Sequence, residues 1–216
     1  DSYTSSNNFL SARSGTSGRG FHGVFNSQSI ANTGDKITVT YSFTTPATVG
    51  VAGVKSTALK VGFFNSNGAT SANGGPIHTT YGLSSSDSGW NTVYGEAVDL
   101  DVNDAANSNF TFRSKTSSVA TGKLLNAYTG WTGQGSNVDG AYSIAANSSY
   151  VGTFTIENKG SDLYDLSATI SSGGTLLASE TREGKTIAAT AFDIIAFNHS
   201  SYAFGSTNSA GVADNG

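Results

Sequence analysis

The nine residues KITVTYSFT, at positions 36–44, alternate apolar and polar side chains without a break. The apolar positions are Ile37, Val39, Tyr41 and Phe43, and the residues between them are threonine and serine. Successive side chains of a strand point to opposite faces, so this period of two predicts a strand with one buried face and one solvated face.

Similar short runs, rich in β-branched and aromatic residues, recur along the chain. They lie at residues 21–26, 59–65, 93–102, 109–114, 149–158, 162–170, 175–182 and 191–198. Turn-forming clusters such as NTGD, NKGSD and SSGG separate many of them, and no window carries an apolar helical stripe for three turns. We therefore predict an all-β fold, a two-sheet antiparallel β-sandwich of the jelly-roll kind, formed by a single domain over residues 1–216.

Composition restricts the partners of this chain. Charged residues make up only 12% of the 216 residues, against a usual share of roughly 25%. The net charge of −4 leaves no basic face, which argues against nucleic acid, because its binding depends on Lys and Arg at the phosphates. No apolar run approaches the roughly 20 residues of a membrane-spanning helix, so no membrane span is expected.

The chain contains no methionine and begins at Asp1. A chain without methionine does not begin at its own start codon, which indicates processing such as removal of a signal peptide. We therefore expect an exported protein, located outside the cell or at the cell surface.

The stretch VYGEAVDLDVND, residues 93–104, concentrates acidic side chains in a chain that has few of them. On a strand, Glu96 and Asp99 point to opposite faces, so they do not form the pair of carboxyl groups, about 5 Å apart, of a retaining glycosidase. Closely spaced carboxylate and amide oxygens suit Ca²⁺, although the stretch departs from the EF-hand pattern. The alternative is a polar strand face that runs into a turn. The candidate ligands for Ca²⁺, the one cofactor considered, are Asp99, Asp101, Asn103 and Asp104.

Four aromatic residues lie beside glycines in turn-rich surroundings, and two of them fall in residues 114–140, which we predict to be a long loop. Exposed Trp and Tyr rings stack on the apolar faces of sugars, while amides and carboxylates nearby hold the hydroxyls. The alternative is that these rings cap the open ends of the sandwich. The candidate carbohydrate-binding residues are Trp90, Tyr94, Tyr128 and Trp131.

Catalytic chemistry has weaker support. A polysaccharide lyase could use His78, Tyr81 and Arg113 to neutralise a uronate and abstract its proton, but the sequence does not show that they meet. The three histidines lack metal-ligand spacing, and no nucleophile elbow or phosphate-binding loop is present.

Four segments carry a resemblance to a known family: RGFHGVF, GDKITVTYSFT, LKVGFFNSNG and TAFDIIAFN. Together they resemble the concanavalin A-like sandwich domains of bacterial exported proteins of the PEP-CTERM type, over about residues 18–216. The resemblance implies a lectin-like sandwich outside the cell, associated with the envelope or the matrix. In similar proteins a further strand begins at about the position of ADNG, and without it the sheet would expose an unpaired edge.

These observations favour a non-enzymatic exported structural or adhesive subunit, one that assembles through edge strands and termini into a filament, sheath or layer. The alternative is a lectin-like protein that binds polysaccharide. A polysaccharide lyase or a glycoside hydrolase is a weaker third reading, because a fold does not assign a function.

Overall fold

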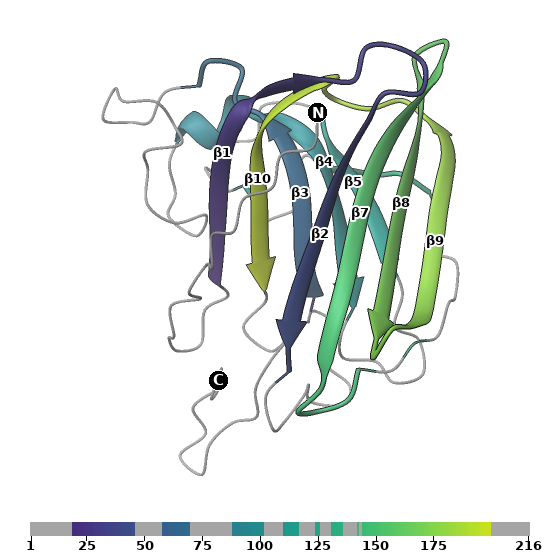
Figure 1. The fold of residues 1–216 in the computed structure, drawn as a ribbon. Helices are drawn as coiled ribbons and strands as arrows, with labels where there is room; N and C mark the ends of the chain where they lie inside the picture. The colour runs from purple at the N-terminus through teal and green to yellow at the C-terminus, as the bar shows by residue number, and fades with distance from the viewer. Residues whose placement is uncertain are drawn as a thin grey trace.

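The protein is an all-β two-sheet sandwich in which the described strands all pair antiparallel (Figure 1). The computed structural model describes residues 19–45, 58–69, 88–101, 110–116, 124–125, 131–135, 142 and 144–199. The larger sheet has the order β1 (Arg19–Ser29), β10 (Ala191–His199), β3 (Ala58–Asn65), β4 (Tyr94–Asp101), β5 (Phe110–Lys115) and β6 (Trp131–Gly133). The smaller sheet has the order β2 (Lys36–Thr44), β7 (Ser149–Gly160), β8 (Leu163–Ser172) and β9 (Thr175–Lys185).

All nine segments predicted from period-two patterns form strands, with ends that shift by a few residues. One strand was not predicted. β6 lies inside the segment of residues 114–140, which we expected to be a loop throughout. A 3-10 helix, η2 (Ser88–Thr92), precedes β4. No helix among the described residues is long and apolar enough to span a membrane.

The hairpin turns follow the predicted signals. Gly173 and Gly174 connect β8 to β9 with φ angles of 56° and 81°. Two consecutive positive φ values match the twist of the flanking strands and are favourable for glycine, which has no Cβ to clash. The β7–β8 turn uses Ser161 and Asp162 in the same left-handed region, with φ of 56° and 58°.

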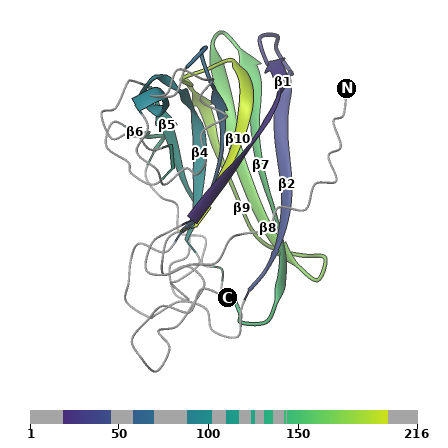
Figure 2. The same ribbon diagram turned by 90° about the vertical axis from the view of Figure 1, so that its left-hand side faces the viewer.

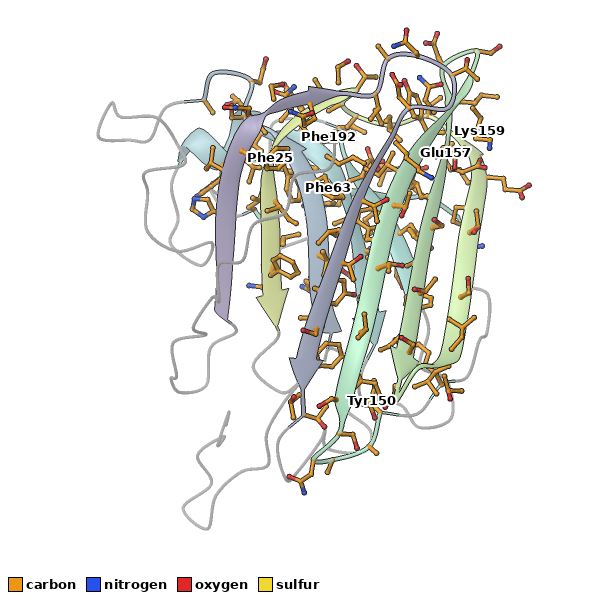
Figure 3. All side chains as sticks on the ribbon, viewed as in Figure 1. Phe25, Phe63, Tyr150, Glu157, Lys159 and Phe192 are labelled. Atoms are coloured by element: carbon orange, nitrogen blue, oxygen red, sulfur yellow. The ribbon has the colours of Figure 1, made fainter. Side chains whose placement is uncertain are left out.

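The main core fills the space between the two sheets, which Figure 2 shows as separate layers. Burial alternates along β7 and β8, as the period of two requires. Phe63 of β3 stacks on Phe154 of β7 with ring centroids 5.8 Å apart, and Phe192 lies 6.0 Å from Phe63. Figure 3 shows side chains of both sheets directed into this space. Each such phenylalanine contributes about 1.5–3 kcal/mol by leaving water.

A second cluster covers the outer face of the six-stranded sheet. Phe64 and Ala97 belong to it, while their chain neighbours Phe63 and Val98 belong to the main core. The side chains that cover this face come from η2, from Leu124 and Leu125, and from Trp131. The central strands β3 and β4 are therefore buried on both faces.

Candidate functional site

Trp90 is a core residue. It has 0% exposed surface, belongs to the outer cluster, and packs edge-on against His22 with ring centroids 5.2 Å apart. An indole without exposed surface cannot stack on a sugar ring, so the prediction of an exposed ring does not hold for Trp90. The ring covers the outer face of the six-stranded sheet, and not an open end of the sandwich as the alternative had it.

Two other predicted aromatic residues lie around one lysine. Trp131 is half-buried, contacts Phe64 edge-on at 5.9 Å, and is the register partner of Lys115. Tyr94 is also half-buried, with the Lys115 Nζ 5.9 Å from its ring centroid. The structure thus brings Tyr94 and Trp131 to the same region, while Tyr128 lies outside the described residues.

Lys115 anchors η2 to the sheet. Its side chain is 1% exposed, and its ammonium donates to the backbone carbonyls of Asn91, at 3.2 Å, and Val93. Burial lowers the pKa of Lys115 to about 8, because a charged ammonium loses hydration in the interior. Lys115 is not predictable as a buried residue from the sequence, since the run FTFRSK gives no sign that both of its faces are covered.

Of the four candidate calcium ligands, the structure describes the side chain of Asp99. Asp99 is 7% exposed and accepts a hydrogen bond from the Arg113 Nε at 2.9 Å, as part of an ion pair. The side chain of Asp101 is not described, and Asn103 and Asp104 lie outside the described residues. No group of three or more potential metal-binding side chains occurs among those described. A cation at Asp99 would have to compete with the guanidinium of Arg113.

Glu96 points to the face opposite Asp99, as predicted, and has a structural set of partners. It is fully buried, accepts a hydrogen bond from the Ala188 backbone N–H at 2.7 Å, and is bonded by the Ser114 hydroxyl. Burial raises the pKa of Glu96 to about 8, although these hydrogen bonds favour the charged form and oppose the rise. Glu96 therefore fixes the segment that joins β9 to β10.

Of the three residues considered for lyase chemistry, the structure describes Arg113. Arg113 is paired with Asp99, and His78 and Tyr81 lie outside the described residues. His22 packs against Trp90.

A buried polar row crosses the outer face of the six-stranded sheet. Asn198 of β10 is the register partner of Lys60, which in turn is the register partner of Asp99. Their exposed fractions are 1%, 8% and 7%. The Lys60 ammonium donates to the Leu125 carbonyl at 3.1 Å, and burial lowers the pKa of Lys60, opposed by the charge of Asp99.

Asn198 is the unusual member of this row. Its amide nitrogen and its amide oxygen are both buried without a hydrogen-bond partner among the described residues. Such groups usually have a partner, because leaving one unpaired costs about 1–3 kcal/mol. A group that both donates and accepts, such as a hydroxyl, would satisfy this amide.

The edge of the four-stranded sheet at β2 has a different character. β2 pairs with β7 through nine consecutive residues without a register shift, and no described strand lies on its other side. At the two ends of the ladder, Asn158 N–H donates to the Asp35 carbonyl and Thr45 N–H donates to the Ser148 carbonyl, both at 2.9 Å. Hydrogen-bonded and non-hydrogen-bonded pairs alternate along an antiparallel ladder. The odd-numbered residues of β2 therefore bond to β7, and the even-numbered ones present their N–H and C=O groups to the open edge.

The side chains along this open edge are uncharged except at one end. The even-numbered residues are Lys36, Thr38, Thr40, Ser42 and Thr44, and all are exposed. Their hydroxyls continue onto β7, where Thr38 and Thr155 are hydrogen-bonded at 2.9 Å and Thr153 meets Thr169 of β8 at 2.7 Å. A long, regular, uncharged edge is a template for another strand.

The opposite edge, β9, has features that oppose strand addition. Its pairing with β8 contains two register shifts. Glu180 and Arg182 pair with the core residues Ala168 and Leu166, so their side chains share the core-facing side, where they form an ion pair and are 10% and 12% exposed. Bulges and inward-pointing charges are two ways in which proteins protect a sheet edge. In the other sheet, β1 contains a register shift, and β6 has three residues.

Comparisons with known proteins give little further guidance. No protein-family model matches the chain, and no curated protein matches it significantly. Among solved structures, the chain is similar to a protein of unknown function from Shewanella oneidensis MR-1, with 14% identity over 92% of this chain and 93% of that one. The TM-score is 0.25, and a similarity at this level supports no inference about this chain.

Proposed function

We propose that this protein is a non-enzymatic, exported structural or adhesive subunit of the cell surface or extracellular matrix, which associates with itself through the edge strand β2. The observation that carries the proposal is the outer edge of β2, which has no bulge and no strand beside it among the described residues. The resemblance to exported PEP-CTERM-type sandwich domains supports the location outside the cell.

The surface beside this edge supports the same proposal. Across the four-stranded sheet, one row joins Thr40, Thr153, Thr169 and Ser179, and the next joins Thr38, Thr155, Ser167 and Thr181. These rows carry hydroxyls and no charge. Two copies that approach along these two rows therefore meet no like-charge repulsion, which otherwise keeps proteins apart.

The test compares the oligomeric state of the native protein with that of two variants at one edge position. Thr40→Pro removes an N–H that points to the open edge, and a proline is tolerated there because β7 does not use that N–H. Thr40→Val keeps the β-branched shape and the N–H. We expect an assembly in light scattering for the native protein and Thr40→Val, and a monomer for Thr40→Pro with an unchanged circular dichroism spectrum. A native protein that stays monomeric up to its solubility limit would overturn the proposal.

A second candidate function is binding of polysaccharide at the outer face of the six-stranded sheet. It is favoured by the half-buried rings of Tyr94 and Trp131, which lie around Lys115. A glycan array with Trp131→Ala, and with Trp131→Phe as the control that keeps a ring, tests it. Glycan retention should be lost in the first variant and kept in the second, and equal retention in both would remove Trp131 from the site.

A further inference from the structure

The strand that could complete the β2 edge must be long, regular and free of charges that point toward the core. Within the described residues, β9, β1 and β6 fail this requirement because of bulges, inward charges or length. β2 itself meets it, with nine residues in uninterrupted register. We propose that the partner is the β2 strand of a second copy, paired antiparallel about a two-fold axis at Thr40. This proposal rests on the self-association proposed above and gives its geometry.

The register follows from the backbone. The even-numbered residues of β2 direct their N–H and C=O groups away from β7, so they form the hydrogen-bonded pairs with a second copy. Antiparallel pairing about Thr40 places Thr40 opposite Thr40 and Thr38 opposite Ser42. It uses all nine residues of the strand, whereas an axis at Val39 or Tyr41 leaves residues at the ends unpaired.

The side-chain pairs in this register are favourable. On the core side, Ile37 faces Phe43 and Val39 faces Tyr41, which are pairs between β-branched and aromatic residues. On the outer side, the one charged residue of the strand, Lys36, faces Thr44. No like charges meet across the axis, and the hydroxyl rows of the two copies join.

The proposed contact joins two copies and leaves no β2 edge for a third. A two-fold interface uses the same surface on both copies, so it forms a dimer and consumes both open edges. Four strands from each copy form one continuous sheet of eight, with the protected β9 strands at its two ends. A filament or a layer would then be built from dimers through other surfaces.

Two variants of opposite charge at position 40 test the proposed two-fold contact. Thr40→Lys and Thr40→Glu each place two like charges opposite one another, so each variant alone should be monomeric. Mixed in equal amounts, they should form a heterodimer of twice the monomer mass. Ser167→Lys is the control, because it adds the same charge to the same face of the inner strand β8.

Cross-linking tests the register independently of charge. The chain has no cysteine, so Thr40→Cys introduces a single thiol. Residues of a hydrogen-bonded pair have Cα atoms about 5.5 Å apart, within the range of a disulfide. Under mild oxidation Thr40→Cys should form a covalent dimer, whereas Thr38→Cys alone should not, since it faces Ser42.

The outcomes separate this proposal from the function on which it rests. If the native protein associates but Thr40→Lys associates equally well, the two-fold β2 contact is wrong and self-association stands. A covalent dimer through Thr38→Cys but not through Thr40→Cys would also overturn the register. A monomeric native protein would remove the proposed function itself.

Discussion

At the scale of single residues, Gly95 shows how closely β3 and β4 approach. A Cβ at this position would lie 2.1 Å from the Phe63 carbonyl oxygen and 2.7 Å from the Phe64 Cα. Both are backbone atoms of the paired strand, so neither can move away without disturbing the ladder. We predict that Gly95→Ala lowers the free energy of unfolding by about 3 kcal/mol, or prevents folding.

The matched control for this prediction is Gly133→Ala in β6. A Cβ there has no neighbour within 4 Å. Urea unfolding of the two variants should show a large loss for Gly95→Ala and a change within about 0.5 kcal/mol for Gly133→Ala. Equal losses in the free energy of unfolding would mean that a Cβ at position 95 does not clash with the backbone of β3.

Because Glu96 is buried, we predict that the free energy of unfolding depends on pH. Burial raises its pKa from 4.5 to about 8, so between these pH values the folded protein holds a proton that the unfolded chain has released. The contribution of Glu96 is therefore full below about pH 4.5 and is lost as the pH rises through 8. Glu96→Gln keeps an acceptor for the Ala188 N–H and has no proton to lose. At pH 8 the variant should be more stable than the native protein by on the order of 3 kcal/mol.

The control is Glu157→Gln, which changes a carboxylate near the surface that pairs with Lys159 at 3.0 Å (Figure 3). Thermal unfolding of the native protein, Glu96→Gln and Glu157→Gln at pH 5 and at pH 8 would separate the two positions. A native-like pH slope in Glu96→Gln would show that another group is responsible.

For single residues, the prediction from the sequence is confirmed where the geometry of a strand decides which way a side chain points. Glu96 and Asp99 point to opposite faces because side chains of a strand alternate. It failed for Trp90, because a tryptophan between glycine and asparagine has the same local pattern whether its ring is exposed or covered by a neighbouring segment.

At the scale of elements, we predict that Lys115 stabilises η2. Its ammonium bonds the carbonyls of Asn91 and Val93 at the end of this short helix. Lys115→Met keeps the apolar stem and removes the donor, so the carbonyls lose a buried partner. We expect a loss of about 1–3 kcal/mol, together with faster hydrogen exchange confined to residues around η2.

The pH dependence of this element has the opposite sign to that of Glu96. The pKa of Lys115 is lowered from 10.5 to about 8, so between these values the unfolded chain binds the extra proton. Stability from this group is present above pH 10.5 and is lost as the pH falls through 8. The native protein should gain stability from pH 8 to pH 10 relative to Lys115→Met, as measured by urea unfolding, and parallel profiles would contradict the assignment.

Elements were predictable to different degrees for a physical reason. The nine strands predicted from period two have enough residues for the pattern to appear in the sequence. β6 has only three residues and exists because β5 offers it an edge, with Trp131 as the register partner of Lys115. Its stability comes from pairing with a distant segment, so its own sequence carries no comparable signal.

At the scale of the whole molecule, a β2 dimer predicts that thermal stability depends on protein concentration. Association stabilises the folded form by mass action. The Tm of the native protein should rise as the concentration increases, and that of Thr40→Lys should not. Calorimetry over a hundredfold range of concentration checks this, and a constant native Tm would contradict a dimer that unfolds with its subunits.

The sequence by itself determined the all-β class, the position of nine strands, the turns at Gly173 and Gly174, and the solvated face of β2. These depend on neighbours within a few residues, through side-chain alternation and backbone conformation. Tertiary structure alone decided that β4 is buried on both faces, that Asn198, Lys60 and Asp99 form one row, and that β2 lies at an open edge while β9 is protected. Each of these depends on which strand lies beside which, and strand order joins residues more than a hundred positions apart, as in the pairing of Lys36 with Glu157.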